Sequence, residues 1–166
     1  MADNEKKLLK SYIENIFVEE VMEPNPVTVY EDDELSVVEK LFVDKSIYYI
    51  PVIDRNDQLV GLASRKYLYK TFAPRKILND QMRFEPGIIV DGESFYDKEM
   101  LDLFILRSMM HKNPPTMGLK EKFSDAIQWM LKDHMGCIII IDKSRKPKGI
   151  LTSYSIVSFL GRILLQ

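Results

Sequence analysis

The residues best suited to nucleophilic chemistry are one cysteine and two histidines. Cys137 lies three residues after His134, and the other histidine is His111. A nucleophilic thiol needs a base beside it, but Cys137 begins the apolar run CIIII, where a buried and inert thiol is expected. Three such residues in an apolar setting are also too few for a zinc site. We therefore predict no catalytic residue and no metal site.

Two other patterns could bind ions or phosphate. Asp32, Asp33 and Glu34 could ligate a metal, but they precede a helical pattern and suit the N-terminus of a helix. Arg65 and Lys66 follow Ser64 at the start of another predicted helix. Two cations and a helix N-terminus could meet a phosphate there, or the two side chains could simply face solvent. The Gly-rich loop GxxxxGK[ST] does not occur,.

The composition is typical of a globular protein. The 166 residues are 46% hydrophobic and 29% charged, enough for one domain or for two half-size units that share a core. A net charge of -2 gives no basic field for nucleic acid or an anionic membrane,. The polar start MADNEKKLLK is unlike a signal segment, and the longest apolar run is far shorter than the ~20 residues of a membrane helix. We expect a cytoplasmic protein that binds neither nucleic acid nor membrane.

The elements that would position these residues occur twice. Residues 21–68 align without a gap on residues 109–156, an offset of 88, and nine of the 48 positions are identical. The identical pairs include Met22 with Met110, Asn25 with Asn113, Asp54 with Asp142, and Gly61 with Gly149. An internal repeat of this kind is the sequence signature of a structural unit that is used twice.

Within each copy the hydrophobic period changes in the same order. A strand and a helical pattern (35–42 and 123–131) lead to two β-rich runs (48–53 with 59–64, and 137–141 with 149–152). A second helix follows, over 65–72 and 153–164, with Ser64 and Thr152 as N-caps. Since about 60 residues bury only a modest core alone, we predict an α/β (α+β) fold of two pseudo-symmetric β-α-β-β-α repeats packed sheet to sheet. An N-terminal helix (1–15) precedes repeat 1 (16–72), and an insertion (73–100) precedes repeat 2 (101–166).

The order V-M-x-x-x-P-V-T-V, helix, I-P-V-I-D, turn, L-V-G-L-A-S resembles a CBS domain. With the second copy, the chain is similar to a tandem CBS pair, or Bateman module, over residues 16–72 and 104–165. The resemblance implies a regulatory homodimer that binds an adenine nucleotide (AMP, ADP or ATP) or an adenosyl compound in clefts between the repeats. It also implies that occupancy is passed to a partner protein of unknown identity, and that no cofactor is required.

The resemblance also implies two sets of ligand-binding residues. The first is Val27, Thr28, Tyr49, Ile50, Pro51, Ser64, Arg65 and Tyr67, and the second is Pro115, Thr116, Cys137, Ile138, Ile139, Thr152 and Ser155. The family's Ser/Thr-x-x-Asp element has Tyr67 or Ser155 in place of its Asp, and one hydroxyl replaces two acceptor oxygens. This departure leaves open an alternative, a degenerate pair that acts as a dimerisation or protein-interaction module without nucleotide.

The net charge of -2 is the sum of an acidic first half and a basic second half of the chain. Residues 13–72 carry 12 acidic and 6 basic side chains, whereas residues 101–166 carry 5 acidic and 10 basic ones. Complementary fields select the orientation of partners, so we predict an antiparallel dimer in which repeat 1 of each chain faces repeat 2 of the other. For the insertion, our hypothesis is that one of its side chains occupies a cleft.

Overall fold

The structure, a computed structural model, describes residues 2–66 and 106–165. The predictions that concern Tyr67 and the 73–100 insertion lie outside the described residues. Among the helices that the structure describes, none is long and apolar enough to cross a membrane.

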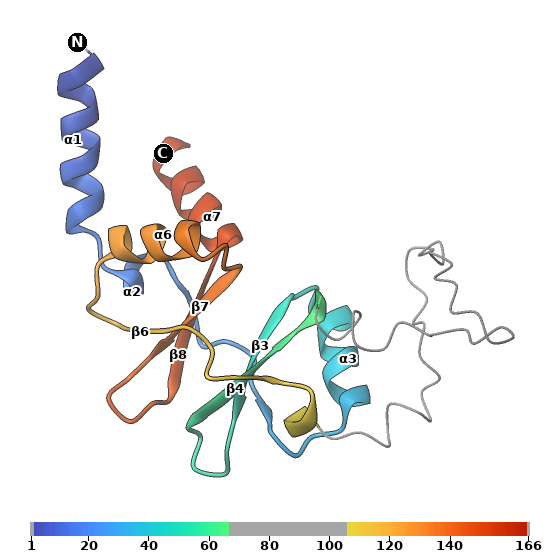
Figure 1. The fold of residues 1–166 in the computed structure, drawn as a ribbon. Coiled ribbons are helices and arrows are strands. Elements are labelled where there is room, and N and C mark those ends of the chain that lie inside the picture. Colours follow the sequence, from blue (N-terminus) through green and yellow to red (C-terminus); the bar gives the residue numbers. More distant parts are fainter. Residues whose placement is uncertain (1, 67–105, 166) are drawn as a thin grey trace, which may run out of the picture.

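The described elements confirm the predicted fold class, with one further two-residue strand at the start of each copy, and of the closing helix predicted for copy one only residues 65–66 are described. Copy one contains α1 (Ala2–Asn15), α2 (Val18–Val21), β1 (Glu23–Pro24), β2 (Val29–Tyr30), α3 (Leu35–Asp44), β3 (Tyr49–Ile53) and β4 (Leu59–Ser64). Copy two contains the 3-10 helix η1 (Leu106–Ser108), β5 (His111–Lys112), β6 (Thr116–Gly118), α6 (Phe123–Lys132), β7 (Cys137–Ile141), β8 (Pro147–Thr152) and α7 (Ser153–Leu164). In Figure 1 the two β-hairpins lie between α6 on one side and α3 on the other.

The two sheets exchange their leading strands. One sheet has the order β2-β3-β4-β5 and the other β1-β8-β7-β6, so the first strand of each copy pairs with the last strand of the other copy. Glu23 lies opposite Ile150, and His111 lies opposite Leu62. These pairs correspond at the repeat offset of 88, so the exchange is reciprocal and obeys the pseudo-twofold symmetry.

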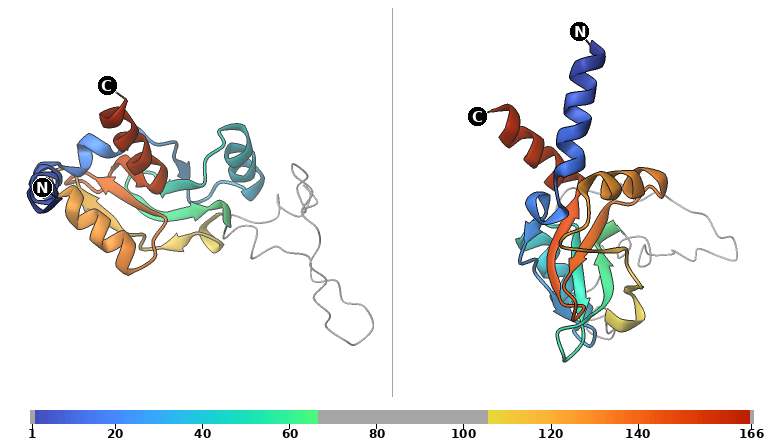
Figure 2. Two further views of the ribbon diagram at one scale, coloured as in Figure 1. Left: turned by 90° about the horizontal axis from the view of Figure 1, so that it is seen from above. Right: turned by 90° about the vertical axis from the view of Figure 1, so that its left-hand side faces the viewer.

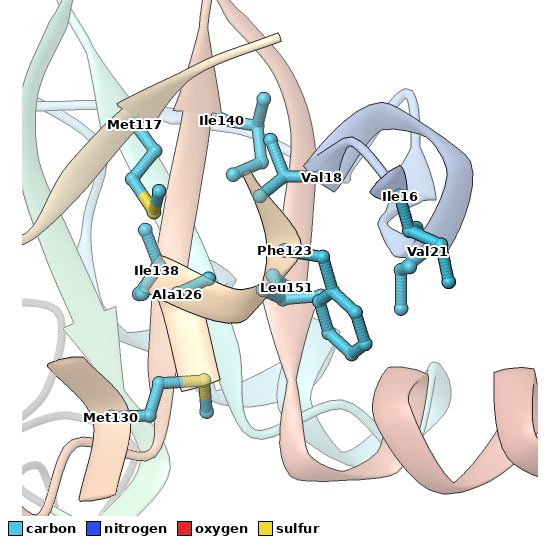
Figure 3. Close-up of a cluster of buried hydrophobic side chains, with 10 residues drawn as sticks. All are labelled: Ile16, Val18, Val21, Met117, Phe123, Ala126, Met130, Ile138, Ile140 and Leu151. Atoms are coloured by element: carbon cyan, nitrogen blue, oxygen red, sulfur yellow. The ribbon is translucent and has the colours of Figure 1, made fainter. Parts of the chain in front are cut away.

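The apolar residues form three buried layers. Two layers lie between a sheet and its helices: one gathers around Leu35, Phe42 and Ile50, and the other around Phe123 and Leu151. The second of these also takes in the segment that leads into copy one, as Figure 3 shows, with Ile16, Val18 and Val21 beside the sheet of copy two. The third layer lies between the two sheets and consists of Leu59, Leu62, Cys137, Ile139 and Ile150.

The helix α1 stands apart from these layers over most of its length. Figure 1 and the right view of Figure 2 show it projecting from the body of the molecule, and Leu8 and Tyr12 are exposed. Its last turn contacts the body through Ile13, which packs on the layer around Phe123. Among the side chains of this predicted amphipathic helix (1–15) whose burial the structure describes, Leu8 and Tyr12 are thus exposed and Ile13 packs on the body.

The hairpin turns are fixed by matching aspartates. The Asp54 carboxylate accepts hydrogen bonds from the backbone N–H groups of Asn56 (2.8 Å) and Gln58 (2.9 Å). Asp142 accepts the equivalent bonds from Ser144 (2.9 Å) and Lys146 (3.0 Å). These bonds stabilise the charged form and lower the pKa of both carboxyls below their usual value,.

Backbone strain is also repeated at the offset of 88. Within residues 2–66 and 106–165, six non-glycine residues have a positive φ, a conformation that is costly for most side chains but tolerated by Asn and Asp,. They form three corresponding pairs: Asn25 (53°) with Asn113 (55°), Ser46 (51°) with His134 (50°), and Asp57 (61°) with Arg145 (62°). The two copies therefore share the backbone path of their turns even where the residue types differ.

Two methionines lie directly over two glycines where the exchanged strands meet the hairpins. A Cβ on Gly61 would overlap the Met110 sulfur, and a Cβ on Gly149 would overlap the Met22 sulfur. Each methionine immediately precedes an exchanged strand, β5 or β1. The identities noted at these four positions of the repeat thus have a steric cause.

We expect Gly61→Ala and Gly149→Ala each to lower the free energy of unfolding by roughly 1 to 3 kcal/mol, because the added methyl group must displace a packed methionine. Gly161→Ala is the matched control, since no heavy atom lies within 4 Å of the added Cβ. In the helix α7 it should instead stabilise by about 0.5 to 1 kcal/mol. Urea unfolding of the three variants measures this, and equal stabilities at all three positions would contradict the steric explanation.

Candidate functional site

The candidate ligand-binding residues lie on corresponding strand pairs of the two copies. In copy one Tyr49 of β3 lies opposite Ser64 of β4, and in copy two Cys137 of β7 lies opposite Thr152 of β8. Tyr49 and Cys137 correspond at the offset of 88, and both belong to the inter-sheet layer. The pseudo-twofold symmetry therefore builds two equivalent regions. We call them cleft one (Tyr49, Ser64) and cleft two (Cys137, Thr152), after the clefts that the resemblance predicts between the repeats.

Cleft one is completed by the segment before β2 and by the start of a helix. Val27 and Thr28 precede Val29, which lies opposite Val52 in the parallel pairing of β2 with β3. Arg65 and Lys66 have helical conformation directly after Ser64. The Arg65 guanidinium lies 5.7 Å from the centroid of the Tyr48 ring, so a cation is held at this edge of the cleft.

A proline makes the strand pairing in cleft one shorter than in cleft two. In copy two the backbone N–H of Ile139 donates a hydrogen bond to the carbonyl of Pro115 (2.9 Å). The corresponding residue in copy one is Pro51, which has no N–H to donate. The carbonyl of Val27 therefore lacks that partner, and β2 begins one residue later in its copy than β6 does.

Beside cleft two, the polar groups at the start of α7 hydrogen-bond to one another and to Glu23. Thr152, the predicted N-cap, accepts a bond from the Ser155 N–H (3.1 Å), and the Ser155 hydroxyl accepts one from the Thr152 N–H (2.9 Å). The two hydroxyls are 2.8 Å apart, and the Ser155 hydroxyl donates to a carboxylate oxygen of Glu23 (3.1 Å). Ser155 is only 2% exposed. Both hydroxyls of the predicted second site thus have partners within the chain.

Near the pseudo-twofold axis, Tyr49 lies against the backbone of the second copy. A Cβ on Gly136 would overlap the Tyr49 hydroxyl, so Tyr49 fits only because residue 136 has no side chain. Burial raises the pKa of Tyr49, with a further contribution from the Cys137 thiol. The tyrosine is therefore a neutral hydroxyl at the floor of cleft one.

Cys137 is not an activated nucleophile. Its side chain is 3% exposed, and burial raises the pKa of the thiol to about 12. A reactive cysteine needs a lowered pKa and access to solvent, and here both conditions are reversed. Within the described residues, no group of three or more His, Cys, Asp or Glu side chains is arranged to hold a metal ion.

The other predicted site residues differ in their exposure to solvent: some are exposed, some half-buried and some buried. Val27 is exposed, and Thr28, Pro115 and Thr116 are half-buried, beside the parallel strand pairs. Ile50 and Ile138 point away from the clefts, because alternate residues of a strand face opposite sides, and their side chains lie in the layers beside the helices. Those two residues can offer a ligand only backbone groups.

Two residues that sequence reasoning did not select lie beside the clefts, namely Glu23 and His111. They stand on the exchanged strands β1 and β5, opposite Ile150 and Leu62 of the inter-sheet layer. Their position depends on pairing between residues more than a hundred positions apart for Glu23, which no local periodicity reveals. Their correspondence at the offset of 88 is the one signal in the sequence that links them.

A family model for the CBS domain matches the chain twice, over residues 18–73 and 106–162. A curated relative with the name homoserine O-acetyltransferase, from Methanosarcina acetivorans, is 26% identical over 155 residues, which is 93% of this chain and 24% of that protein. The chain spans between about a quarter and two fifths of the length of the curated relatives that it matches.

Solved CBS domain pairs have the same fold. One pair, in complex with 5′-methylthioadenosine and S-adenosyl-L-methionine, has a TM-score of 0.67 at 18% identity and covers 89% of this chain and 98% of that chain. The structure of CBSX2 in complex with AMP has a TM-score of 0.66 at 20% identity and covers 90% of this chain and 99% of that chain.

The inert state of Cys137 can be tested by alkylation. At pH 8 we expect iodoacetamide to modify Cys137 at least ~100-fold more slowly in the folded chain than in urea, because the thiolate is the reactive form and burial suppresses it. The control is Cys137→Ala combined with Ser144→Cys, whose thiol lies in the exposed turn between β7 and β8. That thiol should react at nearly the same rate in both states. Rapid alkylation of the folded wild-type chain would show an accessible thiolate.

Proposed function

This chain belongs to the CBS domain family, as a tandem pair, and on that premise we propose that it is a regulatory module that binds an adenosyl compound and transmits occupancy to a partner protein. The observation that carries the proposal is the arrangement of cleft one. There the pairing of β2 with β3, shortened at Pro51, lies beside Tyr49, Ser64 and the two cations Arg65 and Lys66.

Each part of cleft one suits one part of an adenine nucleotide. The carbonyl of Val27, which lacks the strand partner that Pro115 has, offers an acceptor to an amino group of a base. Tyr49 offers an aromatic face and a neutral hydroxyl. Ser64, Arg65 and Lys66 offer a hydroxyl and two cations to a phosphate at a helix start. Two CBS pairs of the same fold are known with AMP or with S-adenosyl-L-methionine and 5′-methylthioadenosine, which supports the class of ligand.

The proposal predicts a ligand-dependent rise in Tm. Thermal melting with AMP, ADP, ATP, 5′-methylthioadenosine and S-adenosyl-L-methionine should give a higher Tm with at least one of them. At a concentration 100 times its Kd, that ligand should raise the free energy of unfolding by about 2.7 kcal/mol. Ser64→Ala should reduce that shift, whereas Ser158→Ala, an exposed serine on α7, should leave it unchanged. If no compound raises the Tm, and mass spectrometry finds no small molecule released from the native protein, the proposal fails.

A second candidate function, dimerisation or protein interaction without nucleotide, is favoured by the outer face of α7. Tyr154, Val157, Leu160 and Leu164 recur at intervals of three and four residues, which places them on one face of the helix. All four are exposed, from 43% for Leu160 to 81% for Leu164. An apolar stripe of this kind usually contacts another protein surface, and we propose that a second copy of the chain covers it.

A charge within this stripe should weaken the dimer. We expect Val157→Asp to shift the chain from dimer to monomer in size-exclusion chromatography with light scattering, with association at least about tenfold weaker because a carboxylate would be desolvated. Ser144→Asp adds the same charge in the exposed turn between β7 and β8 and should leave the dimer intact. A wild-type chain that is monomeric at all concentrations would exclude this role for α7.

A further inference from the structure

The two clefts are built alike but carry different charges at corresponding positions. Residues opposite each other in an antiparallel pair place their side chains on the same face of the sheet. Leu62 and Ile150 face the inter-sheet layer, so His111 and Glu23, their partners in β5 and β1, face the edge of that layer too. Cleft one therefore has an imidazole where cleft two has a carboxylate.

The hydrogen bond between Ser155 and Glu23 shows that the Glu23 carboxylate lies beside cleft two. Ser155 has one hydroxyl proton, and it is donated to Glu23 at 3.1 Å. The Thr152 hydroxyl must then donate to Ser155, across the 2.8 Å that separate them. Both hydroxyl protons are then donated in the direction of Glu23, and its carboxylate oxygen is the final acceptor. Glu23 is exposed, and the carboxylate also meets any ligand that enters from solvent.

The start of the helix after each cleft repeats this contrast. In cleft one the first two helical residues after Ser64 are Arg65 and Lys66. In cleft two the corresponding residues after Thr152 are Ser153 and Tyr154, the first two of α7. The start of α7 can stabilise a negative group, but it has the Glu23 carboxylate beside it, whereas the two helical residues described after Ser64 are both cations.

We propose that the clefts discriminate between adenosyl ligands by the charge at the 5′ position. Cleft one takes a ligand with a phosphate, and cleft two takes a ligand whose 5′ substituent is neutral or positive, such as a thioether or a sulfonium. Glu23 is the residue that determines this specificity, because a phosphate carries a charge of about -1.5 to -2 at neutral pH and would be repelled by a carboxylate at the solvent-exposed side of the cleft,. The inference rests on the proposed function and names the ligand class of each cleft.

AMP and 5′-methylthioadenosine test the proposal, because they share the nucleoside and differ at the 5′ position. Isothermal titration of the full chain should give one AMP per chain, and 5′-methylthioadenosine should still bind when AMP is saturating. Glu23→Gln keeps an oxygen that accepts the Ser155 proton but removes the charge. It should add a second AMP per chain, with AMP binding in cleft two at least about tenfold tighter than in the wild type, and change the Kd of 5′-methylthioadenosine less than about twofold.

Two further variants control and reverse the effect. Glu14→Gln removes the same charge on α1, where Glu14 forms an exposed ion pair with Lys10 (3.7 Å), and should leave the binding of both ligands unchanged. His111→Glu places a carboxylate in cleft one and should weaken AMP at least about tenfold, while 5′-methylthioadenosine still binds. Circular dichroism and the Tm show that each variant is folded, and His111→Glu gives a result even if Glu23→Gln does not fold.

The outcomes separate this inference from the proposed function. Two equal AMP sites in the wild type, or AMP binding that neither Glu23→Gln nor His111→Glu changes, would overturn the charge discrimination but leave an adenosyl-binding module. If neither AMP nor 5′-methylthioadenosine binds the wild type or any variant, the proposed function and the inference are overturned together.

Discussion

The reciprocal exchange of β1 and β5 is the constraint on which the rest of the structure depends. Each sheet is completed by a strand from the other copy, so neither copy has a full set of backbone hydrogen bonds by itself. The exchange also brings the sheets face to face, since the strands that cross from one copy to the other lie at both ends of the inter-sheet layer. Further bonds tie the hairpins together: the Leu59 N–H donates to the Arg145 carbonyl (2.9 Å), and Lys146 contacts Asp57 (2.9 Å).

The helices and strands of the hairpins were predictable from the sequence because they are local. The β-rich runs at 137–141 and 59–64 coincide with β7 and β4, and the helix predicted for 153–164 coincides with α7. The Thr152 cap was predictable for the same reason, since a cap depends on residues three positions apart. The pairing of β1 and β5 was not, because strands of two residues have no periodicity and their partners are far away in the chain. The positions of Glu23 and His111 could not be predicted without that pairing.

The repeat separates what the fold requires from what each cleft uses. Several residues that are identical in both copies have a structural role. The methionines pack on the glycines where the exchanged strands meet the hairpins, Asn25 and Asn113 adopt a positive φ, and Asp54 and Asp142 close the turns. Several positions around the clefts differ, with Tyr49 against Cys137, Pro51 against Ile139, and His111 against Glu23. The same scaffold therefore presents different side chains at corresponding positions of the two copies.

The exchanged strands also bear on how such a chain could arise. A single copy would have a hairpin edge with unpaired backbone groups and a leading strand with no partner of its own. Two separate copies could satisfy both needs by lending each other that strand, as halves of a symmetric pair. The present chain has the geometry of such a pair joined into one polypeptide. In a single polypeptide the two copies can differ in sequence. A substitution such as glutamate at position 23 then alters one cleft and not its twin, which no homodimer of a single repeat could achieve.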